Sequence, residues 1–201
     1  MRGAMGPSRN LIIFAKAPRY GAVKRRLAAG IGDAAALRFY RETMGDLIRR
    51  VGRDPRWRTT LWVTPDGLAG RGRFWPWHMA RCPQGQGDLG VRMLRALDGS
   101  GPGPALLVGS DIPGVEAAHL AEAFALLARN DVVFGPAEDG GFWLVGLRRP
   151  GRHVGLFRGV RWSTEHALAD SLGNVPSHMR VGFAARLADI DDAEGYARAR
   201  A

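Results

Sequence analysis

The stretch Ala105-Leu-Leu-Val-Gly-Ser-Asp-Ile-Pro113 joins a short apolar run to a turn of small residues that carries one carboxylate, Asp111. An apolar run of this length, stopped by glycine, is typical of a buried strand. In an open α/β sheet, ligands and metals gather at the carboxyl ends of the strands. The stretch therefore predicts a strand that ends in a binding site, with Asp111 placed for chemistry rather than for packing.

Strand and helix signals alternate along the rest of the chain. Apolar or β-branched runs predict strands over residues 11–15, 59–64, 105–108, 131–134, 142–147 and 179–183. Apolar residues at helical spacing predict helices over 33–51, 88–97 and 116–129, with Asp33 and Asp88 as N-caps and Ser163 as the cap of a further short helix. Such alternation is typical of an α/β fold in which helices cover both faces of a mostly parallel sheet.

Length and composition indicate a single globular unit. The 201 residues are 46% hydrophobic and 24% charged, which is enough for a full core. Residues 1–10 lack the apolar centre of a signal peptide, so we expect a disordered leader followed by one domain over 11–201. The apolar runs are too short to span a membrane. We therefore expect a soluble cytoplasmic protein; the sequence does not predict its oligomeric state.

The formal net charge of +10 is carried almost entirely by arginine. Lys16 and Lys24 are the two lysines, and arginines are spread through every segment. A nucleic-acid-binding protein would gather its cations on one face or in one tail, so nucleic acid is not an expected partner. The single cysteine, Cys82, cannot form an internal disulfide, and we interpret it as a small buried hydrophobe.

A basic loop follows the first predicted strand. It places Lys16, Arg19, Lys24 and Arg25 within ten residues that also contain proline and glycine. A loop that leaves a strand and enters a helix exposes backbone amides, and the added cations would suit a triphosphate. The Walker pattern G-x-x-x-x-G-K-[ST] is absent from the chain. A solvated basic turn is the alternative interpretation.

A glycine-rich segment, Gly85-Gln-Gly-Asp-Leu-Gly90, matches the dinucleotide pattern G-x-G-x-x-G. Two features argue against an NAD site. Pro83 and Gln84 separate the glycines from any predicted strand, and the first strand–helix turn, where this pattern normally lies, is occupied by the basic loop. The remaining interpretations are a flexible turn with Asp88 as N-cap and a loop that lines a nucleotide base or ribose.

Acidic residues form a third group of candidates. They are Asp111, the segment Glu138-Asp-Gly-Gly141, and the run Asp189-Ile-Asp-Asp192. Magnesium usually takes one or two carboxylates together with phosphates and water, so two distant aspartates that converge would suffice. The alternatives are a turn residue for Asp139 and a helix N-terminus for the final run.

Histidine and aromatic residues provide few further candidates for a functional site. The histidines are scattered, and G-x-S-x-G is absent, so hydrolase and zinc-protease classes lack support. Phe142 and Trp143 are expected to pack against the sheet, whereas Trp162 is the better candidate for the wall of a ligand site.

Taken in order, these motifs resemble a known family. The segments are Ala15-Lys-Ala-Pro18, Gly21 to Leu27, Gln86-Gly-Asp-Leu-Gly90, Gly109-Ser-Asp-Ile-Pro113, Gly135-Pro-Ala-Glu-Asp-Gly-Gly141 and Asp189-Ile-Asp191. Over roughly residues 10 to 198, the chain resembles the bacterial radical-SAM/selenodomain-associated transferases of type 1. That family is a branch of the nucleotide-diphospho-sugar transferase (GT-A) superfamily.

The resemblance implies a GT-A fold, a Rossmann-like three-layer α/β/α arrangement with a mixed sheet, and a Mg²⁺ or Mn²⁺ ion. It implies catalytic roles for Lys16, Lys24 and Asp111, with Asp111 and Asp191 as metal ligands. The candidate nucleotide-binding residues are then Ala15, Lys16, Arg19, Lys24, Gln86, Gly87, Asp88 and Ser110. The candidate acceptor-binding residues are Glu138, Asp139, Gly140, Gly141 and Trp162.

The chain departs from the family pattern at two positions. The family's Lys-Thr-Arg-Leu is Lys24-Arg-Arg-Leu27 here, which removes a hydroxyl near the expected phosphates, and the tyrosine after Gly-Gly is Phe142.

Two reactions are compatible with the resemblance: nucleotidyl transfer from a nucleoside triphosphate to a small phosphorylated or hydroxyl acceptor, and glycosyl transfer from a nucleotide sugar. Glycosyltransferases of this superfamily commonly carry D-x-D at the metal site. Ser110-Asp-Ile-Pro113 instead looks like the single-aspartate pattern of molybdenum-cofactor and phospholactate guanylyltransferases, which favours nucleotidyl transfer. A nucleotide-binding module without turnover is the non-enzymatic alternative.

Overall fold

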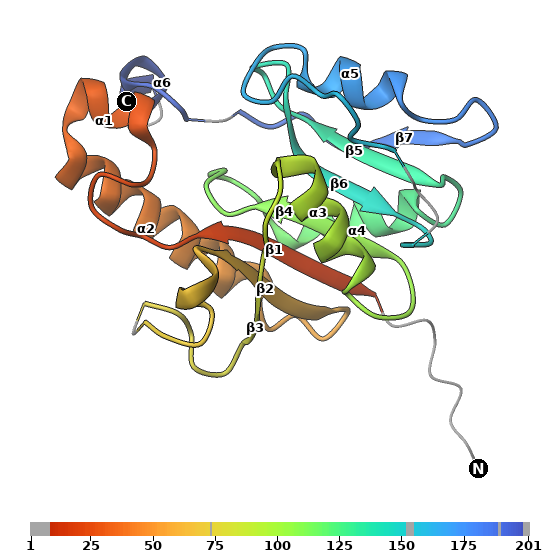
Figure 1. The fold of residues 1–201 in the computed structure, drawn as a ribbon, viewed down its shortest axis with the longest axis horizontal. Helices are drawn as coiled ribbons and strands as arrows, with labels where there is room; N and C mark the ends of the chain where they lie inside the picture. The colour runs from red at the N-terminus through yellow and green to blue at the C-terminus, as the bar shows by residue number, and fades with distance from the viewer. Residues whose placement is uncertain (1–8, 73, 152–154, 189, 199–201) are drawn as a thin grey trace.

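A mixed seven-stranded sheet forms the centre of the computed structural model, which describes residues 9–72, 74–151, 155–188 and 190–198 (Figure 1). The strands are β1 (Asn10–Lys16), β2 (Arg58–Thr64), β3 (Ala80–Pro83), β4 (Ala105–Gly109), β5 (Val132–Pro136), β6 (Phe142–Leu147) and β7 (Val181–Phe183). The helices are α1 (Arg25–Ile31), α2 (Asp33–Val51), the 3-10 helix η1 (Asp66–Leu68), α3 (Leu89–Asp98), α4 (Ala117–Leu126), α5 (Ala167–Gly173) and α6 (Ala193–Arg198).

The strand order is β3-β2-β1-β4-β6-β5-β7. β1 pairs in parallel with β2 and with β4, and β2–β3 and β5–β7 are also parallel. β6 runs antiparallel to both of its neighbours. The predicted mostly parallel, mixed sheet is therefore confirmed.

Two hydrophobic clusters lie on opposite faces of the sheet. Leu11 and Ile13 of β1 belong to one cluster, together with residues of α2 and α4, and Ile12 belongs to the other, together with residues of α3 and α5. Because successive side chains of a strand point to opposite faces, a run of buried apolar residues needs cover on both sides. This requirement produces the three layers that the alternating pattern predicts.

Several local predictions are wrong. α1 and β3 are absent from the predicted elements, since a seven-residue helix and a four-residue edge strand are too short for a clear period. Asp33 is the first residue of α2, and Gly32 is its N-cap. His166, not Ser163, is the N-cap of α5, because Ser163 lies in a left-handed turn with φ 60°. Asn10 is buried in β1, whereas residues 1–8 of the predicted leader lie outside the described residues.

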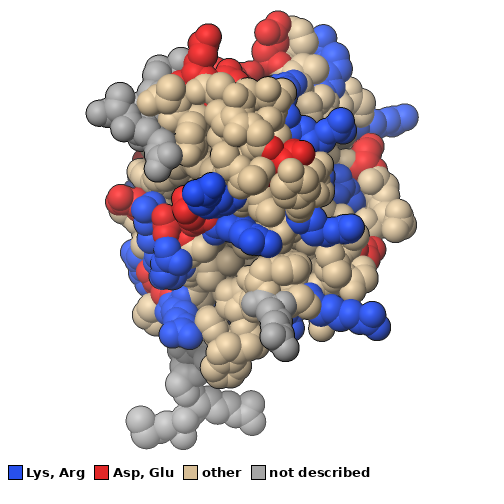
Figure 2. Space-filling view, turned by 90° about the vertical axis from the view of Figure 1, so that its left-hand side faces the viewer, with Lys and Arg blue, Asp and Glu red and all other residues tan. Residues whose placement is uncertain are grey.

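No helix in the described ranges is both long and apolar enough to cross a membrane. Figure 2 shows the face that carries the left-hand side of Figure 1, where α1 and α6 lie. Lysine and arginine side chains are interspersed there with acidic and uncharged atoms rather than joined in one patch. This distribution on the visible face agrees with the spread of arginine along the sequence.

Candidate active site

The carboxyl ends of β1 and β4 open at the same edge of the sheet because the two strands are parallel neighbours. β1 ends in Lys16, and β4 leads into Ser110 and Asp111. A cavity of about 530 Å³ lies over these ends. Its charged lining residues are Lys16, Lys24, Arg25, Arg26 and Arg92, with Asp111, Asp139 and Asp191. We call it the cationic cavity.

Lys24 links the two candidate metal ligands. It takes a left-handed conformation (φ 45°, ψ 54°) directly before α1, and 2% of its side chain is exposed. Its Nζ lies 3.0 Å from Asp111 Oδ2 and 3.5 Å from Asp191 Oδ1. A buried ammonium needs such partners, because an unpaired charge away from water is strongly destabilising. The structure thus brings together three predicted site residues from distant parts of the sequence.

Asp191 reaches the cavity because the chain beyond β7 runs along the sheet. The indole of Trp143, which is buried as predicted, donates to the carbonyl of Ala185 over 2.9 Å. Asp191 Oδ2 then lies 3.2 Å from Arg26 Nη1, and α6 packs against α1 (Figure 1). Asp189, the first residue of the predicted acidic run, lies outside the described residues.

Tyr40 of α2 fixes the ends of β1 and β4, a role that the sequence does not indicate. Its hydroxyl accepts from the Lys16 amide (2.9 Å), donates to the Lys16 carbonyl (2.7 Å) and lies 2.8 Å from Ser110 Oγ. Since the phenol has one proton, Ser110 donates to Tyr40 in this arrangement. Burial raises the pKa of the Tyr40 phenol above its ordinary value. The helical spacing identifies Tyr40 only as a position that faces the core.

Gln84 and Arg92 also line the cavity and are absent from the predicted set. The buried Gln84 amide donates to the carbonyls of Ala15 (3.1 Å) and Trp62 (3.0 Å), which joins the ends of β1 and β2. Its Oε1 accepts from Arg92 Nη1 over 2.8 Å, which holds the guanidinium at the cavity. The position of Gln84 directly after a strand could have indicated a site residue. It was missed because β3 itself was not predicted.

Pro83 is the last residue of β3, so Gln84 alone separates the glycine-rich segment from a strand, and the expectation that both residues separate it is wrong for Pro83. β3 nevertheless lies at the edge of the sheet, and the turn after β1 is still the basic loop. Asp88 caps α3 as predicted, with Oδ1 accepting from the Val91 amide over 2.8 Å.

A second cavity, of about 350 Å³, adjoins the first. The two share Phe14, Leu89, Asp111, Asp139 and Ser163. The second cavity is also lined by Met93, Leu107, Gly109, Ile112, Ala137, Gly141, Phe142, Trp143, Trp162, Thr164 and Ala167. We call it the apolar cavity. Asp111 and Asp139 lie where the two cavities meet, and Trp162 lines the apolar cavity; its contact with a ligand stays a prediction.

The turn over residues 138–141 is held in place by its own contacts. Asp139 Oδ1 accepts from the Gly141 amide over 2.9 Å, so Asp139 is a turn residue as well as a lining residue. Gly140 has φ 82°, and a Cβ there would lie 2.2 Å from the carbonyl oxygen of Glu165. This close approach requires glycine and fixes the turn against the segment before α5.

Some predicted residues lie outside both cavities. Among the described residues, the lining does not include Arg19, Gln86, Gly87, Asp88, Glu138 or Gly140. The carboxylate of Asp88 is engaged as a helix cap, and Arg19, Gln86 and Glu138 are exposed to solvent. Direct ligand contacts by these residues stay predictions.

Asp111 and Asp191 suit a hard divalent ion. The described part of the chain contains no group of three or more histidine, cysteine, aspartate or glutamate side chains that could hold a metal. Magnesium and manganese accept fewer protein ligands when phosphate oxygens and water complete the shell. The Lys24 ammonium now lies between the two carboxylates, so a cation is already accommodated at that point. The two carboxylates are donors of the type that such an ion takes, and binding of the ion by this pair stays a prediction.

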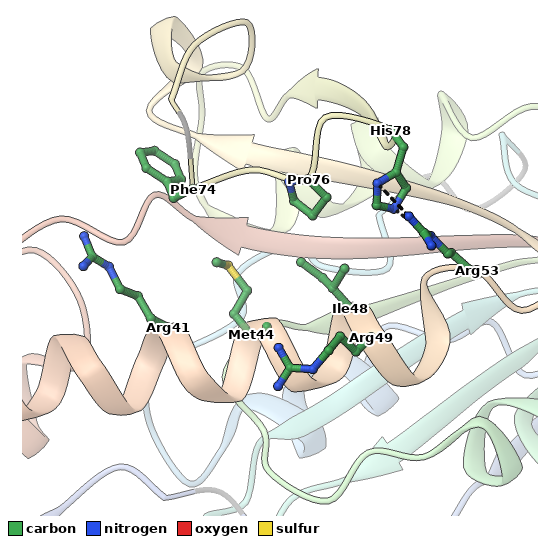
Figure 3. Close-up of a pocket in the computed structure, with 9 residues that line it drawn as sticks. Arg41, Met44, Ile48, Arg49, Arg53, Phe74, Pro76 and His78 are labelled. Carbon is green, nitrogen blue, oxygen red and sulfur yellow. Dashed lines mark hydrogen bonds between the residues drawn. The ribbon is translucent and has the colours of Figure 1, made fainter.

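A third cavity, of about 490 Å³, lies between α2 and the loop before β3 (Figure 3). Phe74 and Pro76 extend over α2, where Met44 and Ile48 form the floor, and Arg53 Nε donates to His78 Nε2 over 3.2 Å. Its described lining residues include neither aspartate nor glutamate. The strand-end carboxylates therefore point to the first two cavities as the candidate active site.

Three solved structures illustrate what the fold of this chain is similar to. A protein assigned as a nucleotide-diphospho-sugar transferase from Desulfovibrio desulfuricans G20 has a TM-score of 0.78 and 26% identity, over 92% of this chain and 82% of that one. The 4-diphosphocytidyl-2C-methyl-D-erythritol synthase from Anaerococcus prevotii DSM 20548 has a TM-score of 0.58 and 10% identity, over 96% of each chain. Rv0371C from Mycobacterium tuberculosis H37Rv, solved in complex with manganese, has a TM-score of 0.51 and 15% identity, over 95% and 97%.

These likenesses confirm the predicted GT-A fold, and the transferases among them support an enzymatic role. No curated protein sequence matches the chain. The association with radical-SAM proteins stays a prediction. A family model described as "Uncharacterized protein conserved in bacteria" (DUF2064) matches residues 47–164, more than half of the sequence, and the chain belongs to that family.

Proposed function

We propose that this chain is a metal-dependent nucleotidyltransferase that uses a nucleoside triphosphate and a small acceptor. The observation that carries the proposal is the convergence of Lys24, Asp111 and Asp191 in the cationic cavity. In the reaction, an acceptor oxygen forms a bond to the α-phosphorus. The bond from that phosphorus to the bridging oxygen of the β-phosphate breaks, and pyrophosphate leaves.

The protein's part in this reaction is to bind and position charge. Lys16, Lys24 and Arg92 line the cavity and would neutralise the triphosphate and the departing pyrophosphate. Tyr40 and Gln84 hold the ends of β1, β2 and β4 by buried hydrogen bonds, so the surrounding frame is fixed before substrate arrives. Fixed charges in a cavity partly shielded from water act more strongly than the same charges in solution.

Asp111 and Asp191 would hold Mg²⁺ or Mn²⁺, which supplies further charge neutralisation at the phosphates. The manganese in a structure of the same fold supports this choice of ion. Lys24 would exchange its carboxylate partners for phosphate oxygens when the ion binds.

Glycosyl transfer from a nucleotide sugar is the second candidate, favoured by the likeness to the Desulfovibrio protein. Ser110-Asp-Ile-Pro113 supplies a single aspartate rather than D-x-D, which supports nucleotidyl transfer. The two functions therefore differ in the donor that the protein should bind, a nucleoside triphosphate or a nucleotide sugar, and this difference can be tested.

The test is a thermal-shift panel of the four ribonucleoside triphosphates and common nucleotide sugars, each with and without Mn²⁺. At about 100 times Kd a bound donor stabilises the fold by roughly 2.7 kcal/mol. We expect a metal-dependent shift with one triphosphate in the wild type. A shift only with a nucleotide sugar would favour glycosyl transfer, and no shift with any donor would overturn both functions.

A further inference from the structure

Charge divides the candidate site into two parts. The lysine and arginine residues at the site, among those the structure describes, line the cationic cavity; the lining of the apolar cavity contains neither residue type. The charged groups that the apolar cavity does have are the carboxylates of Asp111 and Asp139. The described lining of the second cavity therefore contains no positive partner for an anionic group.

The walls of the apolar cavity are largely aromatic and aliphatic. The ring of Phe142 stacks on Phe157 (centroids 6.1 Å apart, 13° between planes), and Trp162 meets both rings edge-on at 6.2 and 5.6 Å. Gly90 permits this packing, because a Cβ there would lie 2.5 Å from Phe157 Cβ and 3.0 Å from Trp162. α3 thus approaches closely enough to hold the Trp162 ring beside the cavity.

The polar groups of Trp143 and Thr164 are already engaged. Trp143 Nε1 donates to the Ala185 carbonyl, and Thr164 Oγ1 donates to the Arg161 carbonyl over 2.7 Å. Within the apolar cavity, the charged neighbours of a phosphorylated acceptor would be the carboxylates of Asp111 and Asp139, whereas Lys24 lies on the other side of Asp111, in the cationic cavity. The anion would therefore lose water without gaining a cation from the lining of its own cavity. A neutral molecule with an apolar body would replace water along these walls without that cost.

We propose that the second substrate is an uncharged alcohol with a ring-sized apolar body, bound in the apolar cavity with its hydroxyl directed toward Asp139 and Asp111. This inference rests on the proposed function and selects among its acceptors: a neutral hydroxyl compound rather than a sugar phosphate or other phosphate ester.

A hydroxyl acceptor also needs a group that takes its proton, whereas an ionised phosphate acceptor does not. Asp139 lines both cavities, so its carboxylate is placed between an acceptor in one and a phosphate chain in the other. As the hydroxyl oxygen bonds to the α-phosphorus and pyrophosphate leaves, the hydroxyl proton passes to Asp139. Atoms and charge balance without a further reactant.

The experiment compares two probes that share the same phenylpropyl body, 3-phenylpropanol and its phosphate ester, by saturation-transfer NMR on the full chain with and without the triphosphate and Mn²⁺. We expect the alcohol to bind at least tenfold more tightly than the ester. Trp162→Ala should weaken alcohol binding about threefold to tenfold, and Trp162→Phe should restore most of it. Trp77→Ala is the matched control, because Trp77 is 88% exposed and lines neither cavity.

A charge-addition variant gives a second readout that does not depend on loss of packing. Thr164 is exposed and lines the apolar cavity, and Thr164→Lys should raise the ratio of ester affinity to alcohol affinity at least tenfold relative to the wild type. If the wild type binds the ester as tightly as the alcohol, or if Trp162→Ala leaves alcohol binding unchanged, the inference is overturned. A triphosphate that still stabilises the protein in that case would leave the proposed function standing.

Discussion

The cationic and apolar cavities share a boundary but are built differently. The positive charges of the cationic cavity come from the end of β1, the loop that follows it, α1 and α3, and buried polar side chains hold the strand ends in place. The lining of the apolar cavity comes from α3, from β1, β4 and β6, and from the segment before α5, and ring packing holds part of its wall. One end of the sheet thus provides a place for a polyanion beside a place for a neutral molecule, with Asp111 and Asp139 between them.

The largest effect is expected from Asp111→Asn, because Asp111 lines both cavities and pairs with Lys24. Turnover, followed as pyrophosphate release, should fall about 10²- to 10³-fold, and the metal-dependent thermal shift with triphosphate should disappear. The folded protein should also lose about 1–3 kcal/mol, less than for a fully buried pair, since 35% of the Asp111 side chain is exposed. Asp46→Asn, on the exposed side of α2, is the control. Equal turnover in the two variants would show that Asp111 is not part of the active site.

Lys24→Met should affect nucleotide binding and metal binding in opposite directions. Triphosphate binding should weaken about 10- to 100-fold, because a charge-assisted contact is lost. Manganese binding without nucleotide, measured by electron paramagnetic resonance of the free ion, should strengthen, because an ammonium no longer lies between Asp111 and Asp191.

Lys16→Met is the matched control among the two lysines. Lys16 lines the cavity but is exposed, and it forms no ion pair with either carboxylate among the described residues. It should weaken nucleotide binding without strengthening manganese binding. Weaker manganese binding to Lys24→Met than to the wild type would show that Lys24 does not compete for the metal position.

Tyr40→Phe tests whether the Tyr40 hydroxyl holds the ends of β1 and β4 together at the cationic cavity. The loss of hydrogen bonds to Lys16 and Ser110 should cost about 1–3 kcal/mol in the free energy of unfolding. Burial raises the Tyr40 pKa in the folded state, so the stability that the protonated phenol contributes is fully present below about pH 10, the pKa of the unfolded phenol. Above that pH it decreases by up to about 1.4 kcal/mol per pH unit.

Denaturant unfolding between pH 8 and 11 measures this slope. The Tyr40→Phe variant should show a flatter alkaline decline than the wild type, whereas Tyr20→Phe, at a residue 70% exposed, should follow the wild type. The same alkaline slope in all three proteins would contradict a buried, protonated Tyr40.

The smallest effect is expected from Phe142→Tyr, which introduces into the lining of the apolar cavity the tyrosine that the resemblance to the radical-SAM-associated transferases implies at this position. A phenol hydroxyl there should weaken binding of an aryl alcohol by no more than about fivefold, because an added hydroxyl discriminates poorly in an apolar pocket. Nucleotide binding, measured by thermal shift, should stay unchanged. A larger loss of nucleotide binding than of alcohol binding would mean that the two cavities are not separate subsites.

The residues at strand ends were the most predictable part of the site. Lys16 and Asp111 follow apolar runs whose ends must meet at one edge of a parallel sheet, so local sequence is sufficient to place them. The capping role of Asp88 was equally predictable, because a cap before an apolar helix is a local signal.

Residues that act through long-range contacts were not predictable. Tyr40 has the spacing of a core position, and only the tertiary fold brings its hydroxyl to Ser110, seventy residues away. Gln84 follows an edge strand too short to recognise, and its contacts to Ala15 and Trp62 depend on the strand order. The antiparallel direction of β6 could not be predicted from its apolar run either, because parallel and antiparallel strands can both be buried.

The most direct measurement is anomalous diffraction from crystals of the protein with Mn²⁺ and a non-hydrolysable triphosphate. We expect a manganese peak between Asp111 and Asp191, phosphates in the cationic cavity, Lys24 turned toward them, and no anionic group in the apolar cavity. A triphosphate bound in the cavity between α2 and Phe74, or manganese bound away from Asp111, would contradict the assignment of this strand end as the active site.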